Sequence, residues 1–551
     1  MIENIEITIS NEKYKLSRGT TLGELAVSFQ KNFKYPIILA KVNNHLKELA
    51  EPILDNATIE FLDLTSKEGN RAHIGGLTHV LVYAIKKLFG KDSNIIVKHS
   101  LDKGIYIETT FKLTPSKLET IKDTMKSIID ADMPITKVTI DRLEAMKYFQ
   151  NINDFTKSGV MTYNTNTYVN LYRLGNYYNY FYTLMPPSAG TLSAFELTYI
   201  QENGFLLTFP TVYLPKGIKK YQPHPKMFEV FKECRDWAKI IKVENSVDLN
   251  RVVSRGEINE LIRIDETLQS NKLLNLAKEI NAKKHKIKIV LLAGPSSSGK
   301  TTTARKLCMY LKSFGLTPKV LSMDDYFVER KSTPLDEFGK PDYECLEAVD
   351  LKLFDKQIEE LLKGKKVIIP TFNFSRGEKE FKQEMVLNDN DILVIEGIHA
   401  LDTKVLVNIP KENKYKIYIS ALTELNIDDH NHISTTDNRL LRRIIRDNRT
   451  RGYSVENTLS TWPSVRRGEE KYIFPFQDEA DFIINSALIY ELGVLKTYVE
   501  PLLYSVSQDS IYYGEAKRLL NFLKIFLPIP SDAIPQDSIL REFIGNGCFH
   551  D

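Results

Sequence analysis

The sequence has few cysteines and no long apolar run. Its 551 residues include four cysteines: Cys234, Cys308, Cys345 and Cys548. They lie far apart with no C-x-x-C pair among them, so neither a disulfide framework nor a zinc site is indicated. No uninterrupted apolar stretch reaches about 18 residues, and the first ten residues carry two glutamates where a signal peptide would be basic. We therefore expect a cytoplasmic protein without a membrane span.

The sequence also has little excess charge of either sign. The formal net charge of +3 gives no reason by itself to expect a polyanionic partner. With 42% hydrophobic and 26% charged residues, the composition is that of a soluble globular protein, which excludes wholesale disorder and fibrous repeats. The chain is too long for one hydrophobic core, so about three or four folded units are expected.

The first 64 residues alternate apolar and polar side chains, as half-buried strands do. IEITI, KYKL, IILAKV and ATIEFLDL predict strands, and Thr21 with Glu24 predicts a capping box at the start of one helix. The order of these elements and the phrase TTLGELA resemble the TGS domain, the small module at the front of threonyl-tRNA synthetases. The resemblance implies a β-grasp domain over residues 1–64.

Residues 65–245 continue that resemblance. RAHIGGLTHVLVYAIKKLFG is similar to the first helix of the synthetase's second N-terminal domain, where an H-x-x-x-H motif contributes to an editing site. His79 matches the second histidine, but Gly75 stands in place of the first, and LMPPSAG has neither the cysteine nor the histidine of the later motif. We expect an α+β domain that does not edit, with His73 and His79 as surface or packed helix histidines.

Residues 246–285 predict a helical connector that ends in a basic patch. From Lys286 onward, short apolar strands alternate with amphipathic helices, and six such strands are expected: KIKIVLLAG, KVLSMDD, KVIIPTF, DILVIEG, YKIYIS and ADFIINSA. Unbroken apolar strands are typical of a parallel sheet covered on both faces. We therefore expect an α/β domain over residues 286–530 and a C-terminal tail over residues 531–551.

A phosphate-binding loop follows the first of these strands. The pattern G-x-x-x-x-G-K-[ST] lies between a strand and a helix, where small residues let backbone N–H groups turn toward a phosphate and the helix N-terminus adds positive charge. Lys300 is expected on the β and γ phosphates of ATP, and the Thr301 hydroxyl on Mg²⁺. The expected ATP-binding residues of the loop are Gly294, Ser296, Ser297, Ser298, Gly299, Lys300, Thr301 and Thr302.

Carboxylates follow two other strands of the same domain. LSMDDYF places Asp324 and Asp325 at the edge where ligands enter open α/β sheets, and an aspartate there can accept a proton from an acceptor hydroxyl and help to hold Mg²⁺. Glu396 ends a fully apolar strand, where an unpaired carboxylate is costly to bury. Mg²⁺ or a metal-bound water would account for it.

The segment DNRLLRRIIRDNRTRGYS predicts an arginine-rich helix. At 100° per residue, five arginines fall within an arc of about 120°, and a sixth precedes the stop signal Gly452: Arg439, Arg442, Arg443, Arg446, Arg449 and Arg451. Such a stripe is either a solvated face or, beside a phosphate loop, a mobile lid that neutralises the transferring phosphoryl group and excludes water.

Six blocks in order resemble the uridine kinase and phosphoribulokinase family across about residues 286–505: GPSSSGKTT, LSMDDYF, DYECLEAVDLKLFDKQIEELLKGKKVIIPTFNF, VIEGIHAL, RLLRRIIRDNRTRG and ADFIINSA. The resemblance implies that Asp324 is the catalytic base and that Thr301, Asp324 and Glu396 surround Mg²⁺. It also implies that Arg443, Arg446 and Arg451 are lid arginines that touch phosphates, with Lys300 and Arg443 acting in catalysis.

The acceptor pocket departs from the family's pattern. Uridine kinases place a tyrosine and, five residues on, a histidine where this sequence has Phe372 and Gly377; Glu344 replaces an aspartate that would hold ribose hydroxyls. A buried site that loses donors and acceptors loses discrimination steeply, so the resemblance implies phosphoryl transfer without fixing the acceptor. The expected acceptor-binding residues are Asp325, Tyr326, Glu344, Phe372 and Arg443.

The sequence therefore favours an ATP- and Mg²⁺-dependent kinase that phosphorylates a primary hydroxyl of a nucleoside such as uridine or cytidine. Two alternatives stay open: a kinase of ribulose phosphate, pantothenate or another small alcohol, and an RNA-associated module whose nucleotide site is a switch. Asp324 favours a kinase because a switch needs no base, and the near-neutral charge and missing editing residues stand against RNA. Homo-oligomers are compatible with either reading.

Overall fold

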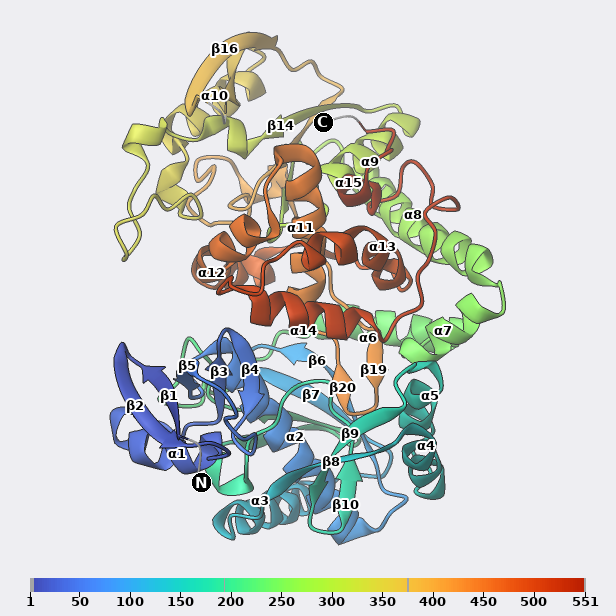
Figure 1. The fold of residues 1–551 in the computed structure, drawn as a ribbon. Coiled ribbons are helices and arrows are strands. Elements are labelled where there is room, and N and C mark those ends of the chain that lie inside the picture. The colour runs from blue at the N-terminus through green and yellow to red at the C-terminus, as the bar shows by residue number, and fades with distance from the viewer. Residues whose placement is uncertain (1–3, 193, 374–375, 550–551) are drawn as a thin grey trace.

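The computed structural model describes residues 4–192, 194–373 and 376–549, so the ends of the expected first and last segments, 1–3 and 550–551, lie outside it (Figure 1). The first domain is a five-stranded sheet in the order β2-β1-β5-β3-β4. Its strands are β1 (Asn4–Ile9), β2 (Glu12–Ser17), β3 (Leu39–Val42), β4 (His45–Glu48) and β5 (Ala57–Leu62). One helix accompanies the sheet, α1 (Leu22–Phe29), and it begins at the expected capping box, because Thr21 and Glu24 exchange side-chain and backbone hydrogen bonds.

The second domain combines two antiparallel sheets with helices. The sheets have the orders β11-β12-β7-β6 and β10-β9-β8. The strands are β6 (Ile95–Leu101), β7 (Gly104–Thr109), β8 (Ile135–Asp141), β9 (Tyr168–Leu174), β10 (Tyr177–Asn179), β11 (Glu196–Gln201) and β12 (Gly204–Thr208). The helices are α2 (Lys67–Phe89), α3 (Pro115–Asp130), α4 (Arg142–Asn151) and α5 (Phe155–Tyr163).

The two histidines of α2 are packed inside this domain. Both side chains are fully buried, and the His79 ring lies 6.2 Å from that of Tyr177 and 5.4 Å from that of Phe181, measured between ring centroids. Burial lowers the pKa of His79 to about 3, so it stays neutral. At Gly75, a Cβ would lie 3.1 Å from the sulfur of Met185. Of the two placements expected for these histidines, the packed one is confirmed.

Three helices connect the second domain to the third: α6 (Pro225–Ile241), α7 (Ser246–Ser254) and α8 (Ile258–Ala282). The third domain contains a sheet in the order β14-β17-β13-β18-β21, in which every neighbouring pair is parallel. Its strands are β13 (Ile289–Ala293), β14 (Thr317–Ser322), β17 (Asp391–Glu396), β18 (Lys414–Ser420) and β21 (Phe482–Asn485). Its helices are α9 (Lys300–Ser313), α10 (Leu351–Leu362), α11 (Thr435–Arg451), α12 (Val455–Tyr472), α13 (Glu491–Tyr504), α14 (Tyr513–Leu523) and α15 (Arg541–Ile544).

Helices cover both faces of this parallel sheet, as expected. Val290 and Leu292 of β13 pack with residues of α8 and α9, whereas Ile289 and Leu291 pack with residues of α6 and α10. The alternation of side chains along a strand sends successive residues to opposite faces, so an unbroken apolar run is buried on both.

One of the six expected strands lies outside the sheet, which corrects the sequence prediction. KVIIPTF forms β15 (Val367–Asn373), which pairs antiparallel with β16 (Glu378–Met385). Ile368 is 49% exposed, so this strand is buried on one face only. Pro370 has no N–H to offer a second neighbouring strand, and the register shifts between Ile369 and Pro370.

A short hairpin ties the third domain into the second. β19 (Asn426–Asp428) and β20 (Asn431–His432) lie among the strands of the second domain in Figure 1. The Val97 N–H donates to the Asp429 carbonyl at 2.7 Å, and the Asn426 side chain donates to the Val97 carbonyl at 2.7 Å. The Lys157 ammonium lies 2.6 Å from the carboxylate of Asp428, and both side chains are fully buried.

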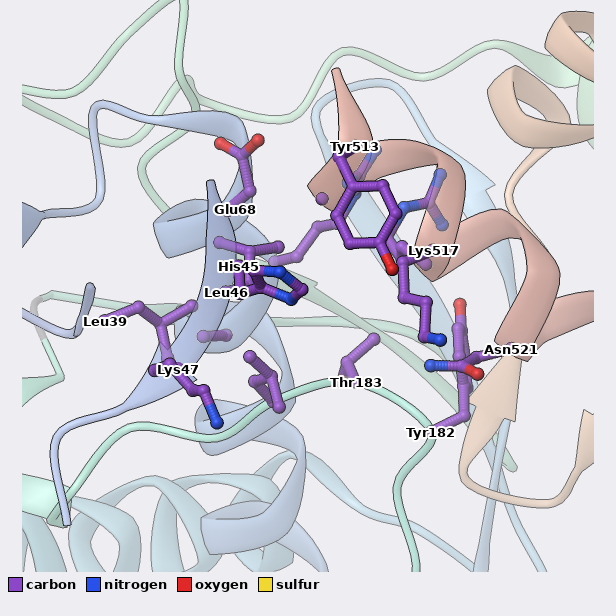
Figure 2. A pocket seen from close by; sticks show the side chains of 15 residues that line it. Leu39, His45, Leu46, Lys47, Glu68, Tyr182, Thr183, Tyr513, Lys517 and Asn521 are labelled. Carbon is purple, nitrogen blue, oxygen red and sulfur yellow. The ribbon is translucent and has the colours of Figure 1, made fainter. Parts of the chain in front are cut away.

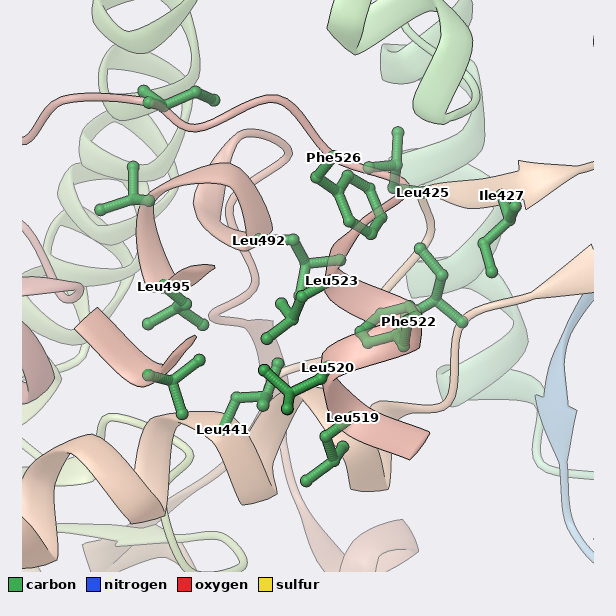
Figure 3. Close-up of a cluster of buried hydrophobic side chains, with 14 of the residues drawn as sticks. Leu425, Ile427, Leu441, Leu492, Leu495, Leu519, Leu520, Phe522, Leu523 and Phe526 are labelled. Carbon is green, nitrogen blue, oxygen red and sulfur yellow. The ribbon is translucent and has the colours of Figure 1, made fainter. Parts of the chain in front are cut away.

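The second and third domains also share a hydrophobic core. One cluster of buried side chains joins residues of the second domain, such as Phe149 and Leu171, to the C-terminal helices, part of which Figure 3 shows around Leu441, Leu492 and Phe522. Four side chains at or beside α15 belong to it: Ile539, Leu540, Phe543 and Ile544. Residues of the expected tail at 531–551 therefore belong to a core that the second and third domains share.

Cavities lie between the domains. A cavity of about 250 Å³ separates the first domain from α14, where the His45 ring packs 4.8 Å from that of Tyr513 (Figure 2). A larger cavity of about 710 Å³ lies between the second domain and helices α11 and α12, with Gly75 and Thr78 on its wall. Among the described residues, no helix combines the length and the hydropathy that crossing a bilayer requires.

Candidate active site

The loop between β13 and α9 is shaped by close approach to the neighbouring strand. A Cβ on Gly294 would lie 2.0 Å from the carbonyl oxygen of Ile419, so only glycine fits there. Gly299 has a φ of +84° and Ser297 a φ of 59°, both in the left-handed region that tight turns use. Within the described residues, the buried hydroxyls of Ser297, Ser298 and Thr303 have no hydrogen-bond partner. The loop is therefore a closely packed turn with unsatisfied polar atoms, which fits a cradle for a phosphate.

Parallel register brings the expected carboxylates to this loop. Leu292 of β13 pairs with Glu396 of β17, and Glu396 pairs with Ser322 of β14. The phosphate loop, Glu396 and the turn that carries Asp324 therefore follow at the same edge of the sheet. The Ser322 hydroxyl donates to the Glu396 carboxylate at 2.9 Å.

The two acids and Lys300 act on one another electrostatically. Burial and the charge of Asp324 raise the pKa of Glu396 to about 7, while Lys300 opposes both effects. Burial also raises the pKa of Asp324, while Lys300, Arg451 and Arg446 oppose that rise. Lys300 itself donates to the Pro295 carbonyl at 3.3 Å. Two carboxyl groups with raised pKa values beside one lysine are typical of a catalytic site.

The oxygen ligands expected for Mg²⁺ fit this arrangement. Asp324 and Glu396 each raise the cost of ionising the other, which a divalent cation would remove, and Thr301 in the first turn of α9 adds a hydroxyl. Within the described chain, no group of three or more acid, histidine or cysteine side chains could hold a metal ion alone. This agrees with the way Mg²⁺ binds through one or two carboxylates together with phosphates and water.

The three expected lid arginines gather around one buried carboxylate. Arg443, Arg446 and Arg451 form ion pairs with Asp447 at 3.1, 3.2 and 3.2 Å. Arg443 also donates to the Ser296 hydroxyl at 2.8 Å, which brings its guanidinium onto the phosphate loop. The loop thus faces a concentration of positive charge supplied by α11.

Two other arginines of the stripe correct the sequence prediction. Arg439 and Arg442 are fully buried, so they belong neither to a solvated face nor to a mobile lid. Arg439 donates to the Ser296 carbonyl at 3.0 Å and pairs with Glu469, which accepts the Ser296 N–H at 3.2 Å. Arg442 pairs with Glu491 and donates to the Ser486 carbonyl at 2.8 Å. Arg439 therefore holds the backbone of the phosphate loop, and Arg442 holds the neighbouring segment at Ser486.

On the acceptor side, Glu344 is the most perturbed acid. Burial and the charge of Glu469 raise its pKa to about 7, while Arg443 opposes the rise. Asp325 accepts the Phe372 N–H at 3.1 Å, and burial raises its pKa as well. The Phe372 ring packs 5.9 Å from that of Phe327. Glu344 and Arg443 therefore act on each other electrostatically.

Tyr326 does not line the site, which corrects its expected role. Its side chain is fully buried, its hydroxyl donates to Gln357 at 2.8 Å, and its ring packs against Phe354. Conversely, sequence reasoning missed His399, which follows Glu396 by three residues. Burial lowers the pKa of His399 to about 4, and among the described residues neither nitrogen of its ring has a hydrogen-bond partner. In the sequence, the signal that could have indicated His399 is its position in the block VIEGIHAL, three residues after Glu396.

Known proteins match the chain in two ways. Residues 289–490 match the family model described as "Phosphoribulokinase / Uridine kinase family". A uridine kinase of Staphylococcus aureus is 30% identical over 202 residues, which cover 36% of this chain and 86% of that enzyme. A solved structure described as a possible uridine kinase from Bacillus stearothermophilus has 21% identity and a TM-score of 0.26, over 39% of this chain and 98% of that one.

A threonine–tRNA ligase of Desulforamulus reducens matches a different stretch of the chain. It is 27% identical over 200 residues, or 36% of this chain. The matching stretch spans 31% of the ligase's own length. The chain is therefore similar to a kinase in one part and to a fraction of a synthetase in another.

Proposed function

Because the chain belongs to the phosphoribulokinase and uridine kinase family through residues 289–490, we propose that it transfers the γ-phosphoryl group of ATP to a primary hydroxyl of a nucleoside such as uridine or cytidine. The observation that carries this proposal is the meeting of Asp324, Glu396 and Lys300 at one edge of the parallel sheet, beside the phosphate loop. A nucleotide switch has no need of a carboxyl group aimed at an acceptor.

In the proposed reaction, the N–H groups of the loop and of the first turn of α9 hold the β and γ phosphates. Lys300 neutralises charge on these phosphates, and Arg443 approaches through Ser296 to stabilise charge that develops on the transferring group. Asp324 accepts the proton of the acceptor hydroxyl while the hydroxyl oxygen bonds to the γ-phosphorus, the bond from that phosphorus to the β–γ bridging oxygen breaks, and ADP leaves. Thr301, Asp324 and Glu396 would hold Mg²⁺, which supplies further charge neutralisation at the phosphates.

Glu344 supports a hydroxyl-rich acceptor. A carboxylate accepts hydrogen bonds from two vicinal hydroxyls, as those of ribose are, and Arg443 favours its charged form. The uridine kinase of S. aureus is a relative over this part of the chain. Phe372 adds an apolar surface beside Asp325, which suits the face of a base.

The proposal is tested with purified full-length protein, ATP, Mg²⁺ and a panel of nucleosides and small alcohols, with products identified by mass spectrometry. We expect at least one nucleoside monophosphate. Asp324→Asn should retain ATP binding and lose about 10²- to 10⁴-fold in transfer rate, whereas the exposed Asp389→Asn should match the wild type. Acceptor-independent ATP hydrolysis across the whole panel would remove the nucleoside assignment, and unchanged turnover in Asp324→Asn would assign the base elsewhere.

A further inference from the structure

A carboxylate from the C-terminal end of the chain lies on the phosphate loop. The N–H of Thr302, in the first turn of α9, donates to the Glu542 side chain at 3.1 Å. N–H groups in the first turn of a helix have no partner within the helix, and here they are the groups that a phosphate would use. Glu542 belongs to α15, which lies against α9 in Figure 1, although 240 residues separate it from Thr302.

Several contacts hold the backbone of Glu542 and its neighbour Phe543 in place. Arg449 of α11 donates to the backbone carbonyls of Glu542 and Phe543 at 2.8 and 3.1 Å. The Phe543 ring lies under the guanidinium of Arg442, 4.9 Å from ring centroid to carbon. These contacts involve the same helix, α11, whose other arginines face the phosphate loop. The position of Glu542 is therefore built into the fold and coupled to the arginine-rich helix.

The segment before α15 approaches the loop as well. A Cβ on Gly299 would lie 2.5 Å from a methyl carbon of Ile539, and Lys306 of α9 forms an ion pair with Asp537 at 2.9 Å. Residues 537–543 thus run across the start of α9. Whatever binds at the N-terminus of α9 must share space with this segment.

The Glu542 side chain can leave without unfolding the segment. Its neighbours Phe543 and Ile544 are buried in the core, whereas Glu542 itself is partly exposed. Its carboxylate also acts on the active site, because its charge contributes to the raised pKa of Glu396. A rotation toward solvent would break one hydrogen bond, free the Thr302 N–H and remove a negative charge from the place where phosphates bind.

We infer that Glu542 is a built-in competitor of the nucleotide: its carboxylate occupies a phosphate-binding N–H of the loop, and ATP binds only when this carboxylate is displaced. The inference rests on the proposed function, since it assumes that a triphosphate binds at residues 294–302. Displacement ties nucleotide binding to the segment at 537–545 and, through Arg449, to helix α11. The Glu542 carboxylate thereby lowers the affinity of the protein for ATP without blocking the site permanently.

The direct test is calorimetric titration of the full-length protein with ATP and Mg²⁺ and without an acceptor. Glu542→Ala should bind ATP about tenfold more tightly than the wild type, because the apparent dissociation constant equals the intrinsic constant divided by the fraction of molecules with an open site. Glu542→Gln should bind more tightly by a smaller factor, since its amide oxygen still accepts the Thr302 N–H. The control Asp532→Asn removes an equal charge from an exposed position just before residues 537–545 and should match the wild type.

Equal affinity in all four proteins, or weaker binding by the Glu542 variants, would overturn the competitor while leaving the kinase proposal intact. Failure of every protein, wild type included, to bind ATP would overturn both. A second measurement uses the wild type alone. On adding ATP and Mg²⁺, amide hydrogen exchange should slow at residues 294–302 and stay unchanged at residues 539–545, and slower exchange in both segments would contradict displacement.

Discussion

Glu469 connects the phosphate loop to two arginines, Arg439 and Arg466. It is fully buried and has three partners: the Ser296 N–H at 3.2 Å, Arg466 at 2.6 Å, and Arg439. In Glu469→Gln, Arg466 keeps its second partner, Glu470, at 3.0 Å, but Arg439 remains buried without a countercharge. Breaking one side of a buried ion pair costs about 3–5 kcal/mol. We expect a loss of stability of that size and weaker ATP binding.

The adjacent residue provides the matched control. Glu470 also pairs with Arg466 but is more exposed, so Glu470→Gln should cost no more than about 1 kcal/mol. Trp462 lies 5.5 Å from the guanidinium of Arg439 and reports on this region. Urea unfolding followed by its fluorescence, in a Trp237→Phe background, gives the comparison. A difference below about 1 kcal/mol between the two variants would refute the assignment of Glu469 as the countercharge of Arg439.

Two further predictions concern the acceptor side and the second domain. The folded protein holds the pKa of Glu344 at about 7, above its ordinary value of 4.5, so it binds more protons than the unfolded chain between these values; its stability should fall by about 3 kcal/mol as pH rises through that window. Glu344→Gln should remove this dependence, and equal pH profiles for variant and wild type in thermal unfolding would disprove it. The full-length protein should not deacylate mischarged tRNA, because Gly75 stands where the synthetase editing motif has its first histidine, and His79 is buried and neutral. The controls are a Gly75→Ala variant and buffer alone. Hydrolysis by the wild type above the rates of both controls would reassign the second domain.

Local sequence patterns predicted those structural features that depend on residues close together in the sequence. The phosphate loop, the capping box at Thr21 and the edge position of Asp324 each follow from a few consecutive residues and the element that contains them. Tyr326 was misassigned because a motif gives a position along the chain and not the direction of a side chain. KVIIPTF was misplaced because a short apolar run does not distinguish burial on two faces from burial on one.

Glu469 and Glu542 could not be found in this way. Each contacts the phosphate loop from 173 and 240 residues away, through a single hydrogen bond to a backbone N–H. Neither belongs to a spaced pattern, and acidic residues at helix positions are usually solvated. Only the packing of α12 and α15 against α9 and α11 identifies them.

The hairpin at 426–432 has a consequence for synthesis of the chain. Its Asn426 donates to Val97, a partner made 329 residues earlier. At roughly 5–20 residues per second, the ribosome needs about 20–60 s to add that length. Throughout that interval the nascent second domain exposes unpaired backbone at Val97 and an uncompensated Lys157, so its folding is completed only after the hairpin at 426–432 has emerged.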